Sequence, residues 1–357
     1  MLASAAVFHA PGKPFSLEVF PIPPMAPGEV LVRIRCATIC GSDLHTYYGR
    51  RHSPAPSILG HEMMGEVAAV HGDGVRYCEG GPIEIGDRVT WSMVWSCGEC
   101  FYCQLGLCSK CEQLFKFGHE RIGVGRDLSG AYAEYCHLQA GTAVFRVPDT
   151  VCDAVAASSN CATATAAAVM RHAGPVAGGS VLIYGAGMLG LTACAMAREA
   201  GAGQVIAVER NEGRRAMALR FGATMAVDAG ERLYEEVMGA TEGRGADVVL
   251  ELAGTPEACE SAVARLRVGG QLVMAGAVFP TRPMALAAEQ VVRRMLRIVG
   301  VYNYQPRDLG TALRFLEKVR EKYPFAELIG KQFPLREINA AVAYAEGEKP
   351  PRVALIP

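Results

Sequence analysis

The 357-residue chain is long enough for two domains, and half of its residues are hydrophobic, so large buried cores are expected. Its formal net charge of −1 argues against a nucleic-acid-binding surface. The first ten residues lack the basic start and long apolar stretch of a secretory signal, so we expect a cytoplasmic protein whose 13 cysteines bind metal or do redox chemistry.

The first 160 residues are predicted to be rich in β-strands and irregular segments, because proline and glycine interrupt them throughout. From Val30 to Cys36, the side chains at even positions are apolar, and Arg33 and Arg35 lie between them. This alternation predicts a strand.

Two short motifs in this region carry side chains that could bind a catalytic metal. Cys-Gly-Ser-Asp-Leu-His begins at Cys40, and Gly-His-Glu surrounds His61. A catalytic zinc needs about three protein ligands and one open position. Cys161 is the third candidate ligand, and Glu62 is an alternative or transient one. The carboxylate of Asp43 has the chemistry to orient His61 through its other ring nitrogen.

A second cysteine group is more compact. Cys97, Cys100 and Cys103 have regular spacing, and Cys111 follows. Four thiolates in a short loop can close tetrahedrally around one zinc and leave no open position, so this site should stabilise the fold. Cys108 lies in the same loop and leaves the fourth ligand open. An iron–sulfur cluster is the competing cofactor, although a redox centre has no evident task here.

Beyond residue 160 the pattern changes to alternating helices and strands. An alanine-rich helix is predicted over 162–170, and six strands follow with helical stretches between them, which describes a doubly wound parallel sheet. The segment 173–197 has no charged residue, but Pro175 and six glycines interrupt it, so a buried strand, turn and helix is favoured over a membrane span. The predicted strands are Val181–Tyr184, Val205–Val208, Met225–Val227, Asp247–Glu251, Gln271–Ala275 and Arg297–Val301; helices and a last strand, Val353–Ile356, complete the chain.

A glycine-rich turn follows the first of these strands. Gly185, Gly187 and Gly190 form G-x-G-x-x-G at the start of a helix, the context in which this motif indicates a dinucleotide site. Glu209, at the end of the next strand, can hydrogen-bond both ribose hydroxyls and would repel a 2′-phosphate. Arg210 beside it could pair with such a phosphate, so NAD is favoured and NADP stays the alternative.

Taken together, these motifs resemble the zinc-containing medium-chain alcohol dehydrogenases over nearly the full length. The resemblance implies an α/β protein in which a GroES-like β-rich catalytic domain (1–160, with a C-terminal return over 301–357) flanks a Rossmann NAD-binding domain (161–300), with the active site in the cleft between them. It also implies a homodimer or homotetramer acting on a small-molecule alcohol or carbonyl, with no nucleic-acid or membrane partner. The matching segments are 40–45, 60–62, Gly86-Asp-Arg-Val89, the four-cysteine lobe and 185–190.

The resemblance also assigns roles to single residues. Ser42 takes the hydroxyl position of a proton relay through the cofactor ribose, and His45 its outer end. Arg352 matches an arginine that contacts the cofactor pyrophosphate, whereas Gly41 stands where some relatives carry another. Polyol-type relatives often have Glu at the position of Cys161, which argues against a sugar alcohol. It further implies two zinc ions per chain: one catalytic, on Cys40, His61 and Cys161, and one structural, on Cys97, Cys100, Cys103 and Cys111.

The substrate is a separate question. Residues 114–120, 160–165 and 303–306 resemble a narrower bacterial group, alcohol dehydrogenases associated with phosphonate catabolism. A phosphonate carries nearly two negative charges near neutral pH and needs cationic donors. The candidate donors are Arg50, Arg51, His52, Lys116 and His119. Alternatives are a dehydrogenase of uncharged polyols or amino alcohols, a lyase or epimerase with transiently used NAD, and a non-catalytic cofactor-binding relative.

Overall fold

The computed structural model describes residues 1–123 and 126–357, which form two compact units. Unit 1 comprises Met1–Cys161, Gln305–Arg320 and Phe325–Pro357, and unit 2 comprises Ala162–Tyr304 and Glu321–Pro324. The chain thus changes unit after residues 161 and 304, where the sequence predicted changes after 160 and 300, and a short segment, 321–324, belongs to unit 2 as well. Among the described residues, no helix has the length and apolar character needed to cross a membrane.

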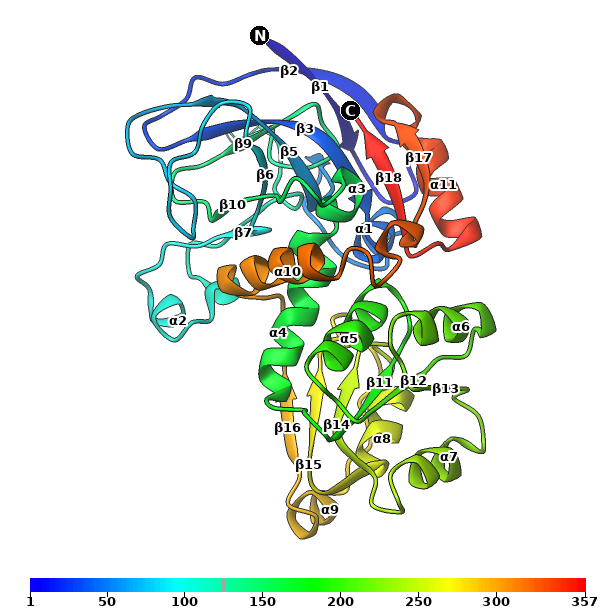
Figure 1. Ribbon diagram of the computed structural model, residues 1–357. Helices are drawn as coiled ribbons and strands as arrows, with labels where there is room; N and C mark the ends of the chain where they lie inside the picture. The colour runs from blue at the N-terminus through cyan, green and yellow to red at the C-terminus, as the bar shows by residue number, and fades with distance from the viewer. Residues whose placement is uncertain (124–125) are drawn as a thin grey trace. The chain divides into compact units, whose positions relative to one another are not determined.

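Unit 2 is built on a sheet of six parallel strands in the order β13-β12-β11-β14-β15-β16 (Figure 1). The order reverses between β11 and β14, the arrangement of a doubly wound dinucleotide-binding sheet. All six predicted strands are present, so the predicted fold of this unit is confirmed. Their bounds are β11 Ser180–Tyr184, β12 Gln204–Val208, β13 Met225–Val227, β14 Ala246–Glu251, β15 Leu266–Met274 and β16 Arg297–Gly300.

Helices cover both faces of this sheet. Helices α4 and α5 contact each other, and α4 also contacts β14 and β15. Helix α8 contacts the same two strands from the other side of the sheet (Figure 1), and its Ala262 and Val263 pack with Leu182, Ile206 and Val249. The helices of this unit are α4 Ala164–Ala173, α5 Met188–Glu199, α6 Glu212–Arg220, α7 Leu233–Ala240, α8 Pro256–Ala264 and α9 Ala288–Arg293.

The start of the predicted alanine-rich helix differs from the expectation. Residues Ser159–Thr163 form a π-helical segment, η2, and α4 begins only at Ala164. π-Helical turns, with hydrogen bonds between residues five apart, are uncommon and are frequent at functional sites. Cys161 lies at the centre of this segment.

Unit 1 contains a sheet in the order β10-β6-β5-β3-β18-β17, with β9 also paired to β3, and a smaller sheet β2-β1-β4. Its buried core includes Val32 and Ile34 of β3 together with Val89, Trp91 and Val353. The strand predicted from Val30 is therefore confirmed. The strands are β1 Leu2–Phe8, β2 Ser16–Pro21, β3 Val30–Ile39, β4 Ser57–Ile58, β5 Glu62–Val70, β6 Arg88–Trp91, β7 Val94–Trp95, β8 Phe115–Lys116, β9 Tyr135–Leu138, β10 Val144–Arg146, β17 Ile329–Pro334 and β18 Arg352–Ile356.

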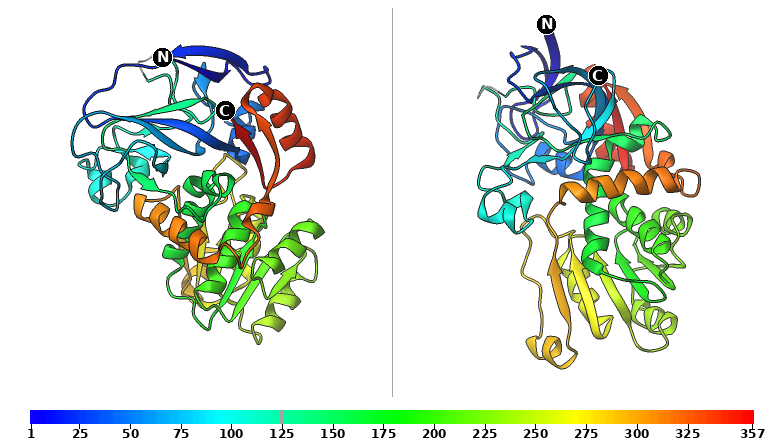
Figure 2. Two further views of the ribbon diagram at one scale, coloured as in Figure 1. Left: turned by 45° about the horizontal axis from the view of Figure 1, so that its top comes forward. Right: turned by 60° about the vertical axis from the view of Figure 1, so that its left-hand side comes forward.

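The C-terminal segment of the chain adds two neighbouring parallel strands to this sheet, β17 and β18, and α11 packs against both (Figure 2). Strand β17 escaped the sequence analysis because its sequence, Ile-Gly-Lys-Gln-Phe-Pro, has no clear alternation and only one buried side chain. The helices of unit 1 are α1 Gly41–Tyr47, α2 Phe101–Gln104, α3 Asp153–Ala157, α10 Pro306–Val319 and α11 Ile338–Glu348, with short 3₁₀ turns η1 Cys108–Lys110, η3 Phe325–Leu328 and η4 Leu335–Glu337.

Candidate active site and metal centres

Four metal-ligating side chains from distant parts of the sequence meet within unit 1. Single ligand atoms of Cys40, His61, Glu62 and Cys161 all lie within 4.8 Å of one another. Cys40 precedes α1 at the end of β3, and Glu62 pairs with Thr38 of β3 in the sheet register, so the two motifs are brought together by strand pairing. The donor set of two thiols, an imidazole and a carboxylate is one that zinc prefers.

Asp43 fixes the orientation of the imidazole. Its Oδ1 lies 3.1 Å from Nδ1 of His61, while its Oδ2 accepts the Cys40 N–H at 3.0 Å. The hydroxyl of Tyr132, which the sequence analysis missed, donates to the same Oδ2 at 3.0 Å. Nε2 of His61 thereby faces Cys161 Sγ and Ser42 Oγ, each at 3.4 Å.

Glu62 is held by an ion pair that sequence reasoning also missed. The Arg352 guanidinium donates from Nε to one carboxylate oxygen at 2.5 Å and from Nη2 to the other at 2.6 Å, and the Thr38 hydroxyl adds a bond of 2.6 Å. Nη2 also lies 3.6 Å from Cys40 Sγ. Arg352 is 8% exposed and Glu62 is fully buried. Arg352, to which the resemblance gives a pyrophosphate contact, is therefore buried beside the candidate metal ligands and paired with the Glu62 carboxylate.

The pKa values of the two thiols of this group are shifted in opposite directions. A hydrogen bond from the Cys161 thiol, together with the nearby Arg352 charge, lowers the pKa of Cys40, whereas the same pairing raises the pKa of Cys161. Metal binding requires deprotonated thiols, so an ion held by both sulfurs would release their protons.

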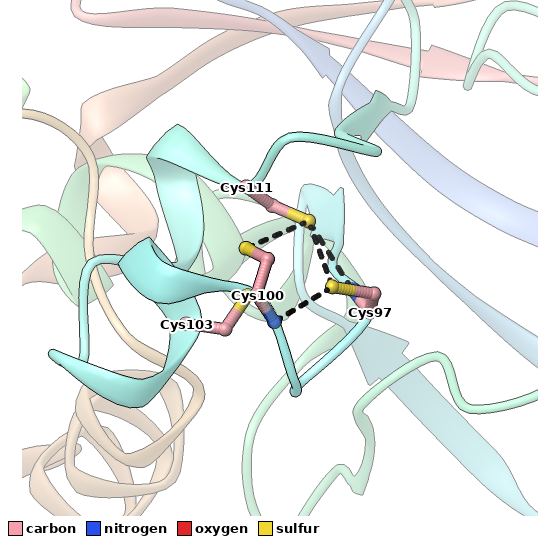
Figure 3. A group of neighbouring side chains, drawn as sticks. All are labelled: Cys97, Cys100, Cys103 and Cys111. Atoms are coloured by element: carbon pink, nitrogen blue, oxygen red, sulfur yellow. Dashed lines mark hydrogen bonds between the residues drawn. The ribbon is translucent and has the colours of Figure 1, made fainter.

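The four-cysteine lobe forms a second ligand group (Figure 3). Cys111 Sγ lies 3.5 Å from Cys97 Sγ and 4.0 Å from Cys100 Sγ, and Cys103 completes the set. Backbone N–H groups of the loop donate to these sulfurs, as from Cys100 to Cys97 Sγ at 3.4 Å. Such donors stabilise thiolates and match a closed Cys₄ metal site. Cys108, the rival fourth ligand, is not part of this group.

The five basic residues proposed for the substrate separate into two sets. Lys116 and His119 are close to the metal ligands: the ring of His119 lies 5.3 Å from that of His61, and burial together with the nearby Arg51 lowers the pKa of Lys116 to about 8. Arg50 instead turns to Glu346 at 2.6 Å.

His52 is exposed. The structure thus brings Lys116, His119 and Arg51 together and leaves Arg50 and His52 on the surface.

Within unit 2 the glycine-rich turn borders a cavity of about 630 Å³. A Cβ on Gly190 would meet Gly185 O at 1.8 Å, so close packing of helix on strand requires glycine there, whereas no atom of the described residues lies within 4 Å of a Cβ built on Gly187. This open approach beside a helix N-terminus suits a pyrophosphate. The cavity is lined by Tyr184, Gly185, Gly187, Val208, Glu209, Arg210, Arg214, Ala229, Leu252, Ala253, Thr255, Glu257, Ala258 and Ser261.

Glu209 occupies the expected place at the end of β12. One of its carboxylate oxygens accepts the Ala186 N–H and the other the Asn211 N–H, each at 3.0 Å. These bonds fix the carboxylate at the cavity wall. Arg210 and Arg214 line the same cavity, and the second arginine was not singled out in the sequence.

A parallel dinucleotide-binding sheet in one unit and two ligand groups suited to zinc in the other define a metal-dependent dehydrogenase. Comparison with known proteins agrees with this class. Residues 26–149 match the family model for the alcohol dehydrogenase GroES-like domain, and residues 189–318 match that for zinc-binding dehydrogenases. An L-threonine 3-dehydrogenase of Idiomarina loihiensis is 37% identical over 285 residues, 77% of each chain.

Solved structures extend the match to the whole chain. An alcohol dehydrogenase of Thermotoga maritima has a TM-score of 0.95 at 29% identity, with full coverage of both chains. A zinc-binding dehydrogenase of Sinorhizobium meliloti, solved with NADP, has a TM-score of 0.87 at 27% identity, also over both full lengths. The chain belongs to the zinc-dependent medium-chain alcohol dehydrogenase family and is an NAD(P)-dependent zinc oxidoreductase that acts on CH–OH groups.

Proposed function

We propose that this dehydrogenase oxidises, or forms by reduction, a small alcohol that carries an anionic group such as a phosphonate. The observation that carries the proposal is the approach of Lys116 and His119 to the candidate catalytic metal ligands, with Arg51 close to both. A dehydrogenase of uncharged alcohols has no need of three basic groups at this place.

The proposed roles of the ligating residues follow from their geometry. Cys40, His61 and Cys161 hold the catalytic zinc, and Asp43 keeps the His61 ring oriented through Nδ1. Glu62 stays paired with Arg352 and serves at most as a transient ligand. The lobe cysteines hold the structural zinc. When bound, zinc supplies Lewis-acid polarisation of the substrate oxygen and NAD supplies the hydride acceptor.

The proton of the alcohol needs a path out of the site. Ser42 Oγ lies next to His61 Nε2 and can accept that proton. His45 is one helical turn further along α1, on the same face. Burial lowers the pKa of His45, so the ring is neutral near pH 7 and able to accept a proton. We propose that Ser42 and His45 together carry the proton from substrate to solvent.

The basic side chains differ in what they would contribute to anion binding. Lys116 is half-buried, and its ammonium is close enough to Arg51 for the two charges to repel. His119 is 8% exposed, and its Nδ1 lies 3.0 Å from the Phe117 carbonyl oxygen, which orients the ring. An anion placed among these groups would relieve the repulsion between Lys116 and Arg51, and so would bind more strongly than to isolated surface charges.

Replacing Lys116 by alanine is expected to raise KM for a hydroxyalkylphosphonate about ten- to a hundredfold, because a hydrogen bond to a charged group contributes about 1.5–3 kcal/mol. KM for an uncharged alcohol of equal length should change much less. Steady-state kinetics on both substrates, with NAD saturating, makes the comparison. Arg50→Ala is the matched control, since Arg50 is paired with Glu346 on the surface.

Equal effects of Lys116→Ala on both substrates, or better turnover of the uncharged alcohol by the native enzyme, would contradict the anionic substrate. L-Threonine belongs in the same panel, since a relative carries that activity in its name and the amino acid bears a carboxylate. Absence of turnover on every alcohol, with both zinc ions present, would favour a non-catalytic relative. Retained cofactor without net NADH production would favour a lyase or epimerase.

We further propose that NAD is preferred over NADP. The Glu209 carboxylate, fixed by two backbone N–H groups at the cavity wall, would repel a 2′-phosphate. Arg210 and Arg214 line the same cavity and would favour that phosphate. The ratio of kcat/KM with NAD to that with NADP is expected to exceed about tenfold, which corresponds to about 1.4 kcal/mol. A ratio below one would show that the arginines dominate.

A further inference from the structure

Glu251, at the carboxyl end of β14, is fully buried in unit 2, and no role in catalysis or metal binding accounts for it. Its Oε1 accepts the N–H groups of Ala253 and Gly254 at 2.9 and 2.6 Å. Among the described residues its Oε2 has no hydrogen-bond partner of ordinary geometry, and the Cys259 thiol of α8 interacts with the same carboxyl group. A buried carboxyl group is costly, so one whose hydrogen bonds go mainly to the backbone of a single loop calls for an explanation.

The explanation lies in the two loops that meet at Glu251. The Glu251 side chain fastens the loop after β14, while its backbone oxygen accepts the N–H groups of Ala275 and Gly276, each at 3.0 Å, from the loop after β15. The loops touch backbone to backbone: a Cβ on Gly276 would lie 2.5 Å from Gly254 N. One residue therefore binds both loops, by its side chain and by its main chain.

The first of these loops forms part of the dinucleotide cavity. Leu252 and Ala253 line it together with Gly185 and Gly187 of the glycine-rich turn. A Cβ added to Gly185 would lie 3.2 Å from Ala253 N, so the loop and the turn are already in close contact. A shift of Ala253 by a fraction of an ångström would change the space in which the cofactor binds.

We propose that Glu251 is a positioning residue for the nicotinamide cofactor. Its carboxylate holds the loop 252–254 in place against the glycine-rich turn, so that the cavity is already formed before NAD binds. The inference rests on the cofactor class of the family and not on the identity of the alcohol. Preorganisation lowers the ordering cost of binding, so its loss should appear in cofactor affinity and much less in the chemical step.

The test is direct titration of the zinc-loaded enzyme with NADH, followed by fluorescence, in the absence of substrate. Glu251→Ala is expected to raise Kd for NADH about tenfold or more. Zinc content should be unchanged, and kcat at saturating NAD should stay within about threefold of the native value. Glu251→Gln keeps an acceptor of the same shape, and its Kd should lie within about threefold of the native Kd.

Asp247 provides a matched control at the opposite end of the same strand. It accepts the Ser180 N–H and hydroxyl at 2.8 and 2.7 Å and does not line the cavity. Asp247→Ala should lower the melting temperature and leave Kd unchanged. If Glu251→Ala fails to fold, Gly276→Ala separates the same loops from the other side and should raise Kd similarly.

Three outcomes would overturn the proposal: an unchanged Kd in Glu251→Ala, an equal rise in Asp247→Ala, or a Glu251→Gln variant as impaired as the alanine variant. The first two would make Glu251 a residue of general stability, and the third would mean that the acceptor geometry is not what matters. Because NADH binding is measured without substrate, an enzyme that binds NADH normally but oxidises no alcohol would contradict the proposed function and leave this inference standing.

Discussion

Cys40→Ala is expected to lower kcat/KM by at least about a thousandfold while the protein remains folded. The thiol is one of the four ligand groups gathered around the candidate catalytic site, and the metal held there supplies several kcal/mol of charge stabilisation. Removing it also takes away the partner of the Cys161 thiol and leaves the Arg352 guanidinium beside a cavity. Zinc content should fall from two ions per chain to one.

Activity, elemental analysis and thermal unfolding of the same preparation test this expectation. Cys36→Ala is the matched control, because Cys36 is a buried cysteine of β3 that lies four positions before Cys40 and outside the ligand group. The control should keep both metal ions and nearly all activity. A Cys40→Ala enzyme with two ions and native turnover would show that the catalytic ligands have been misassigned.

The second large effect is expected from Cys103→Ala in the lobe. A closed four-thiolate site contributes its metal-binding free energy to folding, so losing one ligand should cost several kcal/mol and lower the melting temperature by on the order of 10 °C. Calorimetry and elemental analysis provide the measurements. The remaining ion should be the catalytic one, so activity at low temperature should persist.

Cys108→Ala separates a ligand effect from the loss of any thiol in the same loop. Cys108 lies within the lobe but outside the group of four sulfurs. Its replacement should leave zinc content and melting temperature unchanged. If Cys103→Ala melted like the native protein, or if Cys108→Ala lost the ion instead, the structural site would need a different set of ligands.

The sequence was informative wherever the residues of a site lie close together in the chain. Strand, glycine-rich turn and helix are contiguous, so the doubly wound sheet and its turn could be predicted from the run that begins at Val181. The lobe ligands are likewise close in sequence, and their regular spacing pointed to one ion. Cys108 remained open because spacing alone does not say which of two nearby sulfurs turns inward; backbone geometry around Cys111 decides it.

The candidate catalytic group shows the opposite case. Cys40, His61 and Cys161 were candidate ligands from their motifs and received their zinc roles through the resemblance, yet the distances among them arise from pairing of β3 with β5 and from the π-helical segment at Ser159–Thr163. The sequence analysis predicted an ordinary helix here, because π-helical turns are rare and occur mostly as single turns within or beside α-helices. The fold alone determines where Cys161 points.

By itself the sequence determined the class of protein, the dinucleotide turn and the identity of the candidate ligands, because local motifs encode these. Only the tertiary structure decided which buried polar groups face one another. Two of these contacts join residues that are far apart in the sequence, Tyr132 with Asp43 and Arg352 with Glu62. A third joins the loops that follow two neighbouring strands, which meet at Glu251. A buried donor or acceptor without a partner is costly, so the fold places a partner beside it. Because that partner can come from any part of the chain, no fixed sequence spacing predicts it.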